Sequence, residues 1–265
     1  MLGILTLNYC NEDIVAVPYY GYSFKDGCFR DYMINRVKPK LDDEDWNKEL
    51  LRSCVEGTGY SADKFIDILN SSNSYSNWRI GEAIAECLLE DSGKARFYYN
   101  SSRDLKNPDA SNTGADLVGF CDIDDETLFL FGEVKTSSSP FSPPSVLYGR
   151  TGMIKQLEEL QINKGKQKAL IKWIIGKQKL LPETFEEDFK KALSAYALSN
   201  ENVQFVGVLI RDTIPNELDL KNRAQYLGKK ATSPMRVWLF AFYTGFSMGN
   251  SAWVSAMNGG VTCEG

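Results

Sequence analysis

The segment from residue 113 to residue 137 constrains the fold most, because two apolar stretches flank an acidic turn and carry three ionisable side chains. Short apolar runs on either side of a polar turn predict a β-hairpin. With the turn centred on Asp122–Asp125, Asp116 faces Glu133 across the hairpin. Lys135 lies on the same side as Glu133, because side chains in a strand alternate with a period of two. The hairpin therefore gathers three ionisable groups at its open end.

The register of this hairpin decides whether those groups meet. The same register pairs Val118 with Phe131 and Phe120 with Phe129, all on the face that carries the ionisable groups. A shift of one residue would move one strand's side chains to the opposite face. Burying an unpaired charge is costly. Charged residues within apolar strands therefore indicate a site rather than ordinary packing.

The remaining pattern predicts an α/β (α+β) fold, with a mixed central sheet flanked by helices. Residues 203–210 and 236–243 are almost continuously apolar, which is typical of central strands covered on both faces. Further strands are expected at residues 4–7, 14–20 and 95–100, and helices at 44–56, 61–70, 78–90, from about Gly152, and 183–198. We expect residues 1–75 to form an accessory or partner-docking region, and residues 76–265 to form the main domain.

Composition excludes several classes of active site. The 265 residues include no histidine, which removes Ser-His-Asp triads, Cys-His pairs and His-ligated zinc. Six cysteines without a CxxC pair favour free thiols in a reducing cytoplasm. No apolar stretch approaches the roughly 20 residues that span a membrane, and the N-terminus does not resemble a signal peptide. We therefore expect a cytoplasmic protein without a membrane partner.

The helix expected at residues 78–90 has one narrow polar stripe. On a helical wheel, Arg79, Glu82, Glu86 and Glu90 fall on one side, while most of the remaining surface is apolar. Such a stripe can direct a carboxylate toward a site, or it can be a solvated face. We expect Glu82 to contribute, with Glu86 as the alternative.

Two carboxylates and a lysine on one face suit metal-assisted phosphodiester hydrolysis. Asp116 and Glu133 offer hard oxygen ligands for Mg²⁺, or for Mn²⁺. The backbone carbonyl of Val134 can add a ligand, and Glu82 can complete a second metal position or contact a water molecule. The metal activates a water molecule, and Lys135 orients or deprotonates that water or stabilises the developing anion.

Residues 150–179 form the most basic segment, with eight basic and two acidic side chains in a chain of net charge −5. This segment is the candidate phosphate-binding surface, although lysines on a helix are often simply solvated. Its candidate DNA contacts are Arg150, Lys155, Lys164, Lys166, Lys168 and Lys172.

The motifs resemble those of the PD-(D/E)xK nuclease superfamily. The matching residues are Asp116 in GADLVGF, Glu133-Val134-Lys135 in FLFGEVKTS, Glu82 in the preceding helix and Gln156 in IKQL. An α-β-β-β-α-β order from residue 78 to about residue 210 also matches. The resemblance implies a restriction-endonuclease-like core and Mg²⁺-dependent cleavage of DNA. The literal Pro108-Asp109 pair is not preferred, because its hairpin partner would be Pro140, which cannot donate a strand hydrogen bond.

The length and the GE-x-K motif are also similar to the small nuclease subunit family (HamA) of the Hachiman anti-phage defence system. That resemblance implies an effector nuclease controlled by a helicase partner. Three alternatives stay open: a catalytically silent module that binds nucleic acid or a partner, a sequence-specific restriction-type endonuclease, and a structural ion-pair cluster.

Overall fold

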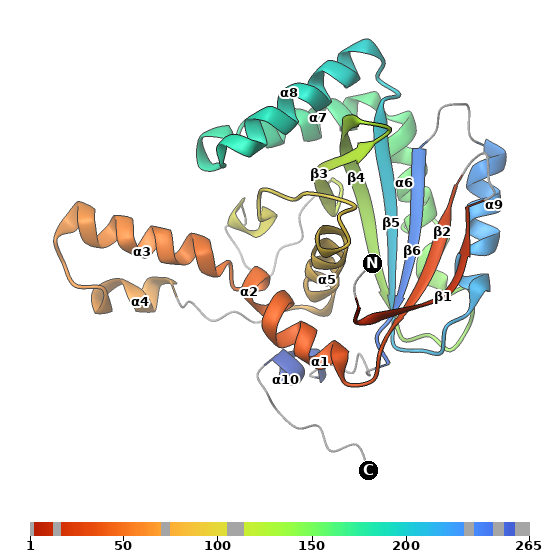
Figure 1. Cartoon of the computed structure of the whole chain (residues 1–265), viewed down its shortest axis with the longest axis horizontal. Coiled ribbons are helices and arrows are strands. Elements are labelled where there is room, and N and C mark those ends of the chain that lie inside the picture. Colours follow the sequence, from red (N-terminus) through yellow and green to blue (C-terminus); the bar gives the residue numbers. More distant parts are fainter. Residues whose placement is uncertain are drawn as a thin grey trace.

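The fold is a six-stranded mixed sheet with helices on both faces (Figure 1). The computed structural model describes residues 3–12, 17–69, 75–104, 114–230, 236–245 and 252–257, with backbone alone at 67–69 and 230. The strands are β1 (Leu5–Asn11), β2 (Tyr19–Phe24), β3 (Leu117–Ile123), β4 (Glu126–Ser137), β5 (Val203–Arg211) and β6 (Arg236–Tyr243). The expected class, a mixed sheet flanked by helices, is confirmed.

Ten α-helices lie within the described residues, together with shorter helical turns. The α-helices are α1 (Cys28–Tyr32), α2 (Lys38–Leu41), α3 (Glu44–Thr58), α4 (Asp63–Leu69), α5 (Asn77–Asp91), α6 (Met153–Ile162), α7 (Lys164–Ile175), α8 (Glu183–Leu198), α9 (Lys221–Lys230) and α10 (Ala252–Met257). The shorter turns are the π-helical η1 (Met33–Val37) and the 3₁₀ turns η2 (Ser101–Asp104), η3 (Ser145–Leu147), η4 (Gln178–Leu180) and η5 (Glu217–Asp219).

The strand order is β1-β2-β6-β5-β4-β3, and the four inner strands β2, β6, β5 and β4 run parallel to one another. Every residue of β5 is buried, which is expected of a parallel strand covered on both faces. One hydrophobic cluster joins the sheet to α1, η1, α5 and α10, and a second joins the opposite face to α6, α7, α8 and α9. The carboxyl ends of β4, β5 and β6 place Ser137, Arg211 and Tyr243 at the same end of the sheet.

The β3–β4 hairpin has the predicted register. Val118 pairs with Phe131 and Phe120 with Phe129. The turn is a two-residue connection in which Asp124 and Asp125 have φ values of 51° and 63°, as a type I′ hairpin turn requires. Asp tolerates this left-handed conformation better than most residues. The acidic turn therefore fixes the register that aligns the ionisable groups.

Several other elements also lie where the sequence predicts them. The helix at 183–198 and the strand at 236–243 have the predicted bounds, and those at 78–90 and 203–210 differ by one residue at one or both ends. The N-terminal strands are displaced: β2 is Tyr19–Phe24, and residues 14–16 of the predicted strand lie outside the described residues.

The prediction of a strand at residues 95–100 is wrong. Only Arg96 forms a bridge, with Phe120, so the expected α-β-β-β-α-β order lacks its first strand. The chain crosses close above Gly119, where a side chain would overlap the carbonyl of Arg96. The aromatic residues that suggested a strand pack into the core instead, as Tyr98 does against Phe120 and Phe185.

The N-terminal region has two parts. Strands β1 and β2 extend the main sheet, with β2 parallel to β6. Helices α3 and α4 project away from the sheet (Figure 1), and α3 has no buried residue. The division into residues 1–75 and 76–265 stays a prediction.

Within the described part of the chain, no helix is both long and apolar enough to cross a membrane. Five cysteines in this part are free thiols: Cys10, Cys28, Cys54, Cys87 and Cys121. These states agree with the absence of any disulfide pattern in the sequence.

Candidate functional site

The site begins where β4 continues past its hairpin partner. β3 starts at Leu117, opposite Gly132, so β4 from Glu133 onward has no partner strand on that edge. Asp116 lies immediately before β3, and its Oδ2 accepts a hydrogen bond of 2.8 Å from the backbone N–H of Val134. The N–H and C=O groups of one strand residue point to the same edge. The carbonyl of Val134 is therefore directed to the same edge as the Asp116 carboxylate.

The three hairpin residues come together as the sequence predicts. Lys135 Nζ lies 3.3 Å from Glu133 Oε2 and 3.9 Å from Asp116 Oδ2. The Glu133 side chain is only 2% exposed, whereas those of Asp116 and Lys135 are 23% and 22% exposed. The cluster thus has one buried carboxylate and two groups that reach solvent.

Burial and like charge together disfavour ionisation of Glu133. Desolvation, reinforced by the neighbouring Asp116 carboxylate, raises the pKa of Glu133 to about 8, and the attraction of Lys135 opposes that shift only in part. A carboxylate beside another carboxylate is harder to ionise, because two like charges at one site repel each other. A carboxylate pKa that is raised by desolvation together with a specific charged neighbour is typical of functional sites.

Glu82 belongs to the same electrostatic group, although α5 covers the opposite face of the sheet. Desolvation and then the Asp116 carboxylate raise the pKa of Glu82 to about 9, and Arg79 and Lys135 lower it. Helix α5 approaches β4 closely at Gly81, because this residue has no side chain; a Cβ atom there would overlap Thr136 Cγ2. The close approach of α5 to β4 therefore positions Glu82 near the hairpin.

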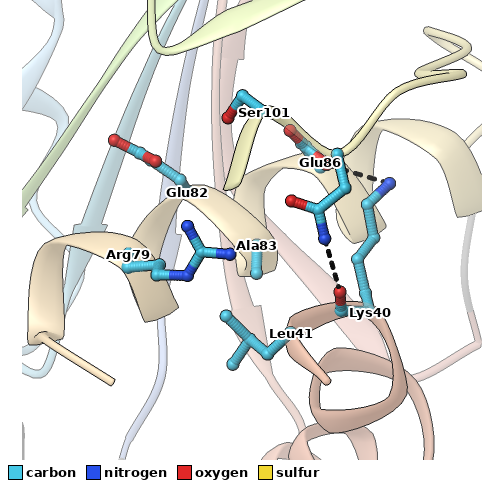
Figure 2. Close-up of a pocket in the computed structure, with 8 residues that line it drawn as sticks. Lys40, Leu41, Arg79, Glu82, Ala83, Glu86 and Ser101 are labelled. Atoms are coloured by element: carbon cyan, nitrogen blue, oxygen red, sulfur yellow. Dashed lines mark hydrogen bonds and ion pairs between the residues drawn. The ribbon is translucent and has the colours of Figure 1, made fainter. Parts of the chain in front are cut away.

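Glu86, the alternative to Glu82, has another partner. Lys40 of α2 lies 2.9 Å from Glu86 and 2.8 Å from Glu90. Figure 2 shows Lys40 and Glu86 pointing toward each other, whereas Glu82 is not joined to Lys40. Lys40 of the N-terminal region therefore pairs with two of the stripe's carboxylates, whereas the raised pKa of Glu82 is caused by desolvation and then by the Asp116 carboxylate.

Gln156 lies in the first turns of α6, on the face of the sheet that carries Glu133. Its Oε1 is buried and has no hydrogen-bond partner among the described residues. Gly207 of β5 is the register partner of Glu133, and a Cβ atom there would lie 2.9 Å from Leu157 Cδ1. The start of α6 thus packs close beside Glu133, with an unsatisfied amide oxygen in the same turn.

The six predicted basic contacts do not form one free cationic surface. Three are paired with carboxylates: Lys155 with Glu158 at 3.8 Å, Lys164 with Glu201 at 2.8 Å and Lys166 with Glu159 at 2.9 Å. Arg150, Lys168 and Lys172 are exposed and have no carboxylate partner within the described residues. Lys164, Lys166, Lys168 and Lys172 lie on α7, a helix that the sequence pattern did not predict.

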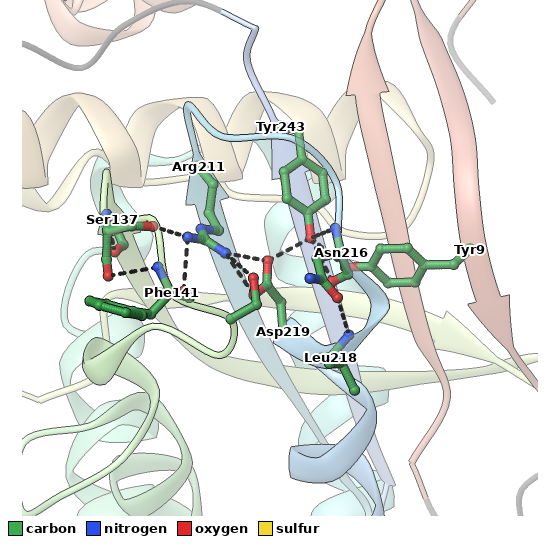
Figure 3. A network of polar contacts seen from close by, with 10 residues as sticks. Tyr9, Ser137, Phe141, Arg211, Asn216, Leu218, Asp219 and Tyr243 are labelled. Carbon is green, nitrogen blue, oxygen red and sulfur yellow. Dashed lines mark hydrogen bonds and ion pairs between the residues drawn. The ribbon is translucent and has the colours of Figure 1, made fainter.

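A buried polar network holds the loop that follows the lysine of β4 (Figure 3). The guanidinium of Arg211 is fully buried and its Nη1 binds both oxygens of Asp219 at 2.6 Å. Its Nη2 donates to the carbonyls of Ser139 and Phe141. Tyr243 donates to Asp219 at 2.7 Å. No sequence pattern predicts this network, because only the sheet order brings β4, β5 and β6 side by side.

Few side chains of the site could act as ligands for a metal ion. Within the described ranges, no three Asp, Glu or Cys side chains are grouped closely enough to hold a metal ion by themselves. Asp116 and Glu133 supply two carboxylates, and Val134 adds a backbone carbonyl at the same edge. Pro108-Asp109 lies outside the described residues.

No protein-family model matches the sequence, and no curated protein is significantly similar to it.

Proposed function

We propose that this protein is a Mg²⁺-dependent nuclease that hydrolyses DNA phosphodiester bonds on a PD-(D/E)xK-like core. The observation that carries the proposal is the convergence of Asp116, Glu133 and Lys135, with Lys135 Nζ at 3.3 Å and 3.9 Å from the two carboxylates. An ordinary surface ion pair joins two exposed side chains of opposite charge. In this cluster, by contrast, Glu133 is buried and lies beside a second carboxylate, that of Asp116. That arrangement suits a cation-binding site.

The residues present fit Mg²⁺. This ion commonly uses one or two protein carboxylates and completes its octahedron with water and substrate phosphates. Asp116, Glu133 and the Val134 carbonyl would hold it, which does not require a third side-chain ligand. Bound there, Mg²⁺ or Mn²⁺ would supply an activated water and neutralise charge on the scissile phosphate.

The other residues have separate roles in the proposed reaction. Lys135 contacts both carboxylates, so its amine can orient the attacking water or stabilise the developing oxyanion. Glu82, neutral at pH 7 because its pKa is about 9, can exchange a proton with that water. The unsatisfied Oε1 of Gln156 can accept a hydrogen bond from it.

We further propose a defence role in which a helicase partner delivers the DNA, following the resemblance to the Hachiman nuclease subunits. The charge of the chain supports a DNA-binding surface that is provided partly by the partner, because duplex binding requires the neutralisation of several phosphates. The chain has a net charge of −5, and three of its six candidate contacts are already paired with carboxylates.

Cleavage of supercoiled plasmid, with and without EDTA, tests the proposed activity. We expect Glu133→Gln and Lys135→Met each to lower the rate by at least about 100-fold while the melting temperature stays close to that of the parent. Glu126→Gln is the matched control, because Glu126 lies exposed at the start of the same strand. Undiminished cleavage by both site variants would refute the assignment.

Two other outcomes point to the alternatives. Metal-independent binding of DNA without cleavage under any condition would favour a silent binding module. Unfolding of Lys135→Met would favour a structural ion-pair cluster, since breaking a buried pair costs about 3–5 kcal/mol.

A further inference from the structure

A partly enclosed cavity of about 730 Å³ lies directly beside the site. Asp116 belongs to the site and also lines the cavity, which extends from β3 to α7. Its volume falls within the range of about 300–1,000 Å³ that is typical of small-molecule pockets. It is large enough to accept a chemical group belonging to the substrate.

The walls of this cavity are mainly apolar and aromatic. They include Val118, Leu160, Leu170, Tyr99 and Trp173. The polar groups of the two aromatic side chains are satisfied by Asp104, to which Trp173 Nε1 and the Tyr99 hydroxyl donate at 2.7 Å and 2.9 Å. The two rings are held edge to face at 5.6 Å. The aromatic surfaces are therefore fixed in place without a bound ligand.

The charges around the cavity are largely compensated. Its three carboxylates are each paired with a lysine: Glu86 with Lys40 at 2.9 Å, Asp104 with Lys177, and Asp116 with Lys135 at 3.9 Å. The remaining lysine that lines it, Lys166, is paired with Glu159 at 2.9 Å. A mainly apolar pocket whose one lining lysine is already paired favours a flat, uncharged group over a phosphate.

We infer that this cavity binds an unpaired nucleobase of the strand that is cleaved. The inference rests on the proposed function, since it places the scissile phosphate at Asp116 and a neighbouring base against Leu170 and Trp173. A base within a duplex cannot enter such a pocket without leaving the stack. The favoured substrate is therefore single-stranded or locally unwound nucleic acid, bound by base contacts as well as by its backbone.

The test measures binding without cleavage, using a fluorescein-labelled oligothymidine and its abasic analogue with the full chain in EDTA. Ala169→Trp fills the cavity from α7, and Ala197→Trp is the matched control, because both alanines are exposed on helices and only Ala169 lines the cavity. We expect Ala169→Trp to weaken oligothymidine binding about tenfold or more, the effect of losing one base contact. The control should stay within about twofold, and the abasic strand should bind both variants equally weakly.

Equal binding of the two oligonucleotides by the parent protein would overturn the inference, as would no binding at all or equal binding by both alanine variants. Its failure is distinguishable from failure of the proposed function. Base-dependent binding without Glu133-dependent cleavage would refute only the nuclease, whereas cleavage without base dependence would refute only the base pocket.

Discussion

Mg²⁺ binding should release protons from the site, and the number released reports which carboxylates take part. Metal ligands must be ionised, so a carboxylate that holds a proton in the metal-free protein loses it on binding. Desolvation and the adjacent Asp116 raise the pKa of Glu133 to about 8, and desolvation followed by Asp116 raises that of Glu82 to about 9.

These pKa values set the expected count. At pH 7 a carboxyl group with a pKa of about 8 is mostly protonated, so Glu133 holds about one proton in the metal-free protein. Glu82, with a pKa of about 9, holds about one further proton. Metal binding that ionises Glu133 alone should therefore release about one proton, and binding that also ionises Glu82 should release about two.

Isothermal titration calorimetry at pH 7 in two buffers of different ionisation enthalpy measures this number directly. Glu133→Gln should weaken Mg²⁺ binding strongly, because the variant lacks one of the two carboxylates. Glu82→Gln is the informative variant: release falls by about one proton if Glu82 ionises on binding, and stays unchanged if Glu82 remains protonated.

The apparent affinity should also increase as the pH rises toward 8, by about tenfold for each pH unit and each proton released. Mg²⁺ binding at pH 7 without proton release, or with an affinity independent of pH between 6 and 8, would refute the assignment of a protonated Glu133 as a metal ligand.

Three further predictions concern stability. Folding raises the pKa of Glu133, so the contribution of this residue to stability is present at low pH and is lost as the pH rises through about 8. Between pH 5 and pH 9 the free energy of unfolding of the metal-free parent, measured with urea, should therefore fall by on the order of 3 kcal/mol more than that of Glu133→Gln. Gly81→Ala should lower the melting temperature, since the new methyl group overlaps Thr136 Cγ2 and overpacking costs about 1–3 kcal/mol; Thr136→Ser, which removes that methyl group, should restore it. Asp219→Ala leaves the buried Arg211 unpaired and should reduce the free energy of unfolding by about 3–5 kcal/mol, whereas replacing both residues by apolar ones should cost less.

Local patterns predicted the hairpin well because local chemistry determines it. The turn residues Asp124 and Asp125 adopt positive φ, and the alternation on both strands then permits one register that buries Phe129 and Phe131 together. The convergence of the ionisable groups at the hairpin's open end follows from that register. The same reasoning fails at residues 95–100, because aromatic content indicates burial and not strand pairing.

Other parts of the site depend on contacts between distant segments. The helix α7 was not predicted, because its lysines and glycine obscure the apolar periodicity of Ile171 and Ile174. Arg211 is the last residue of the apolar strand β5, and its ion pair with Asp219 forms where β5 ends beside β4 and β6. The periodicity of apolar residues predicts individual strands, but it does not predict which strands are neighbours in the sheet.

The polar stripe of α5 is in contact with the N-terminal region through Lys40. Glu82 and Glu86 are equivalent by helical spacing, and the distinction comes from Lys40, which contacts Glu86 and Glu90. Asn100 donates to the carbonyl of Lys40 at 3.1 Å and so anchors α2 against the chain that leads to β3. With Lys40 neutralising the far part of the stripe, Glu82 is the carboxylate whose charge depends on Asp116 and Lys135. Lys40, a residue before position 75, therefore distinguishes Glu86 from Glu82, although none of the proposed catalytic residues lies in that region.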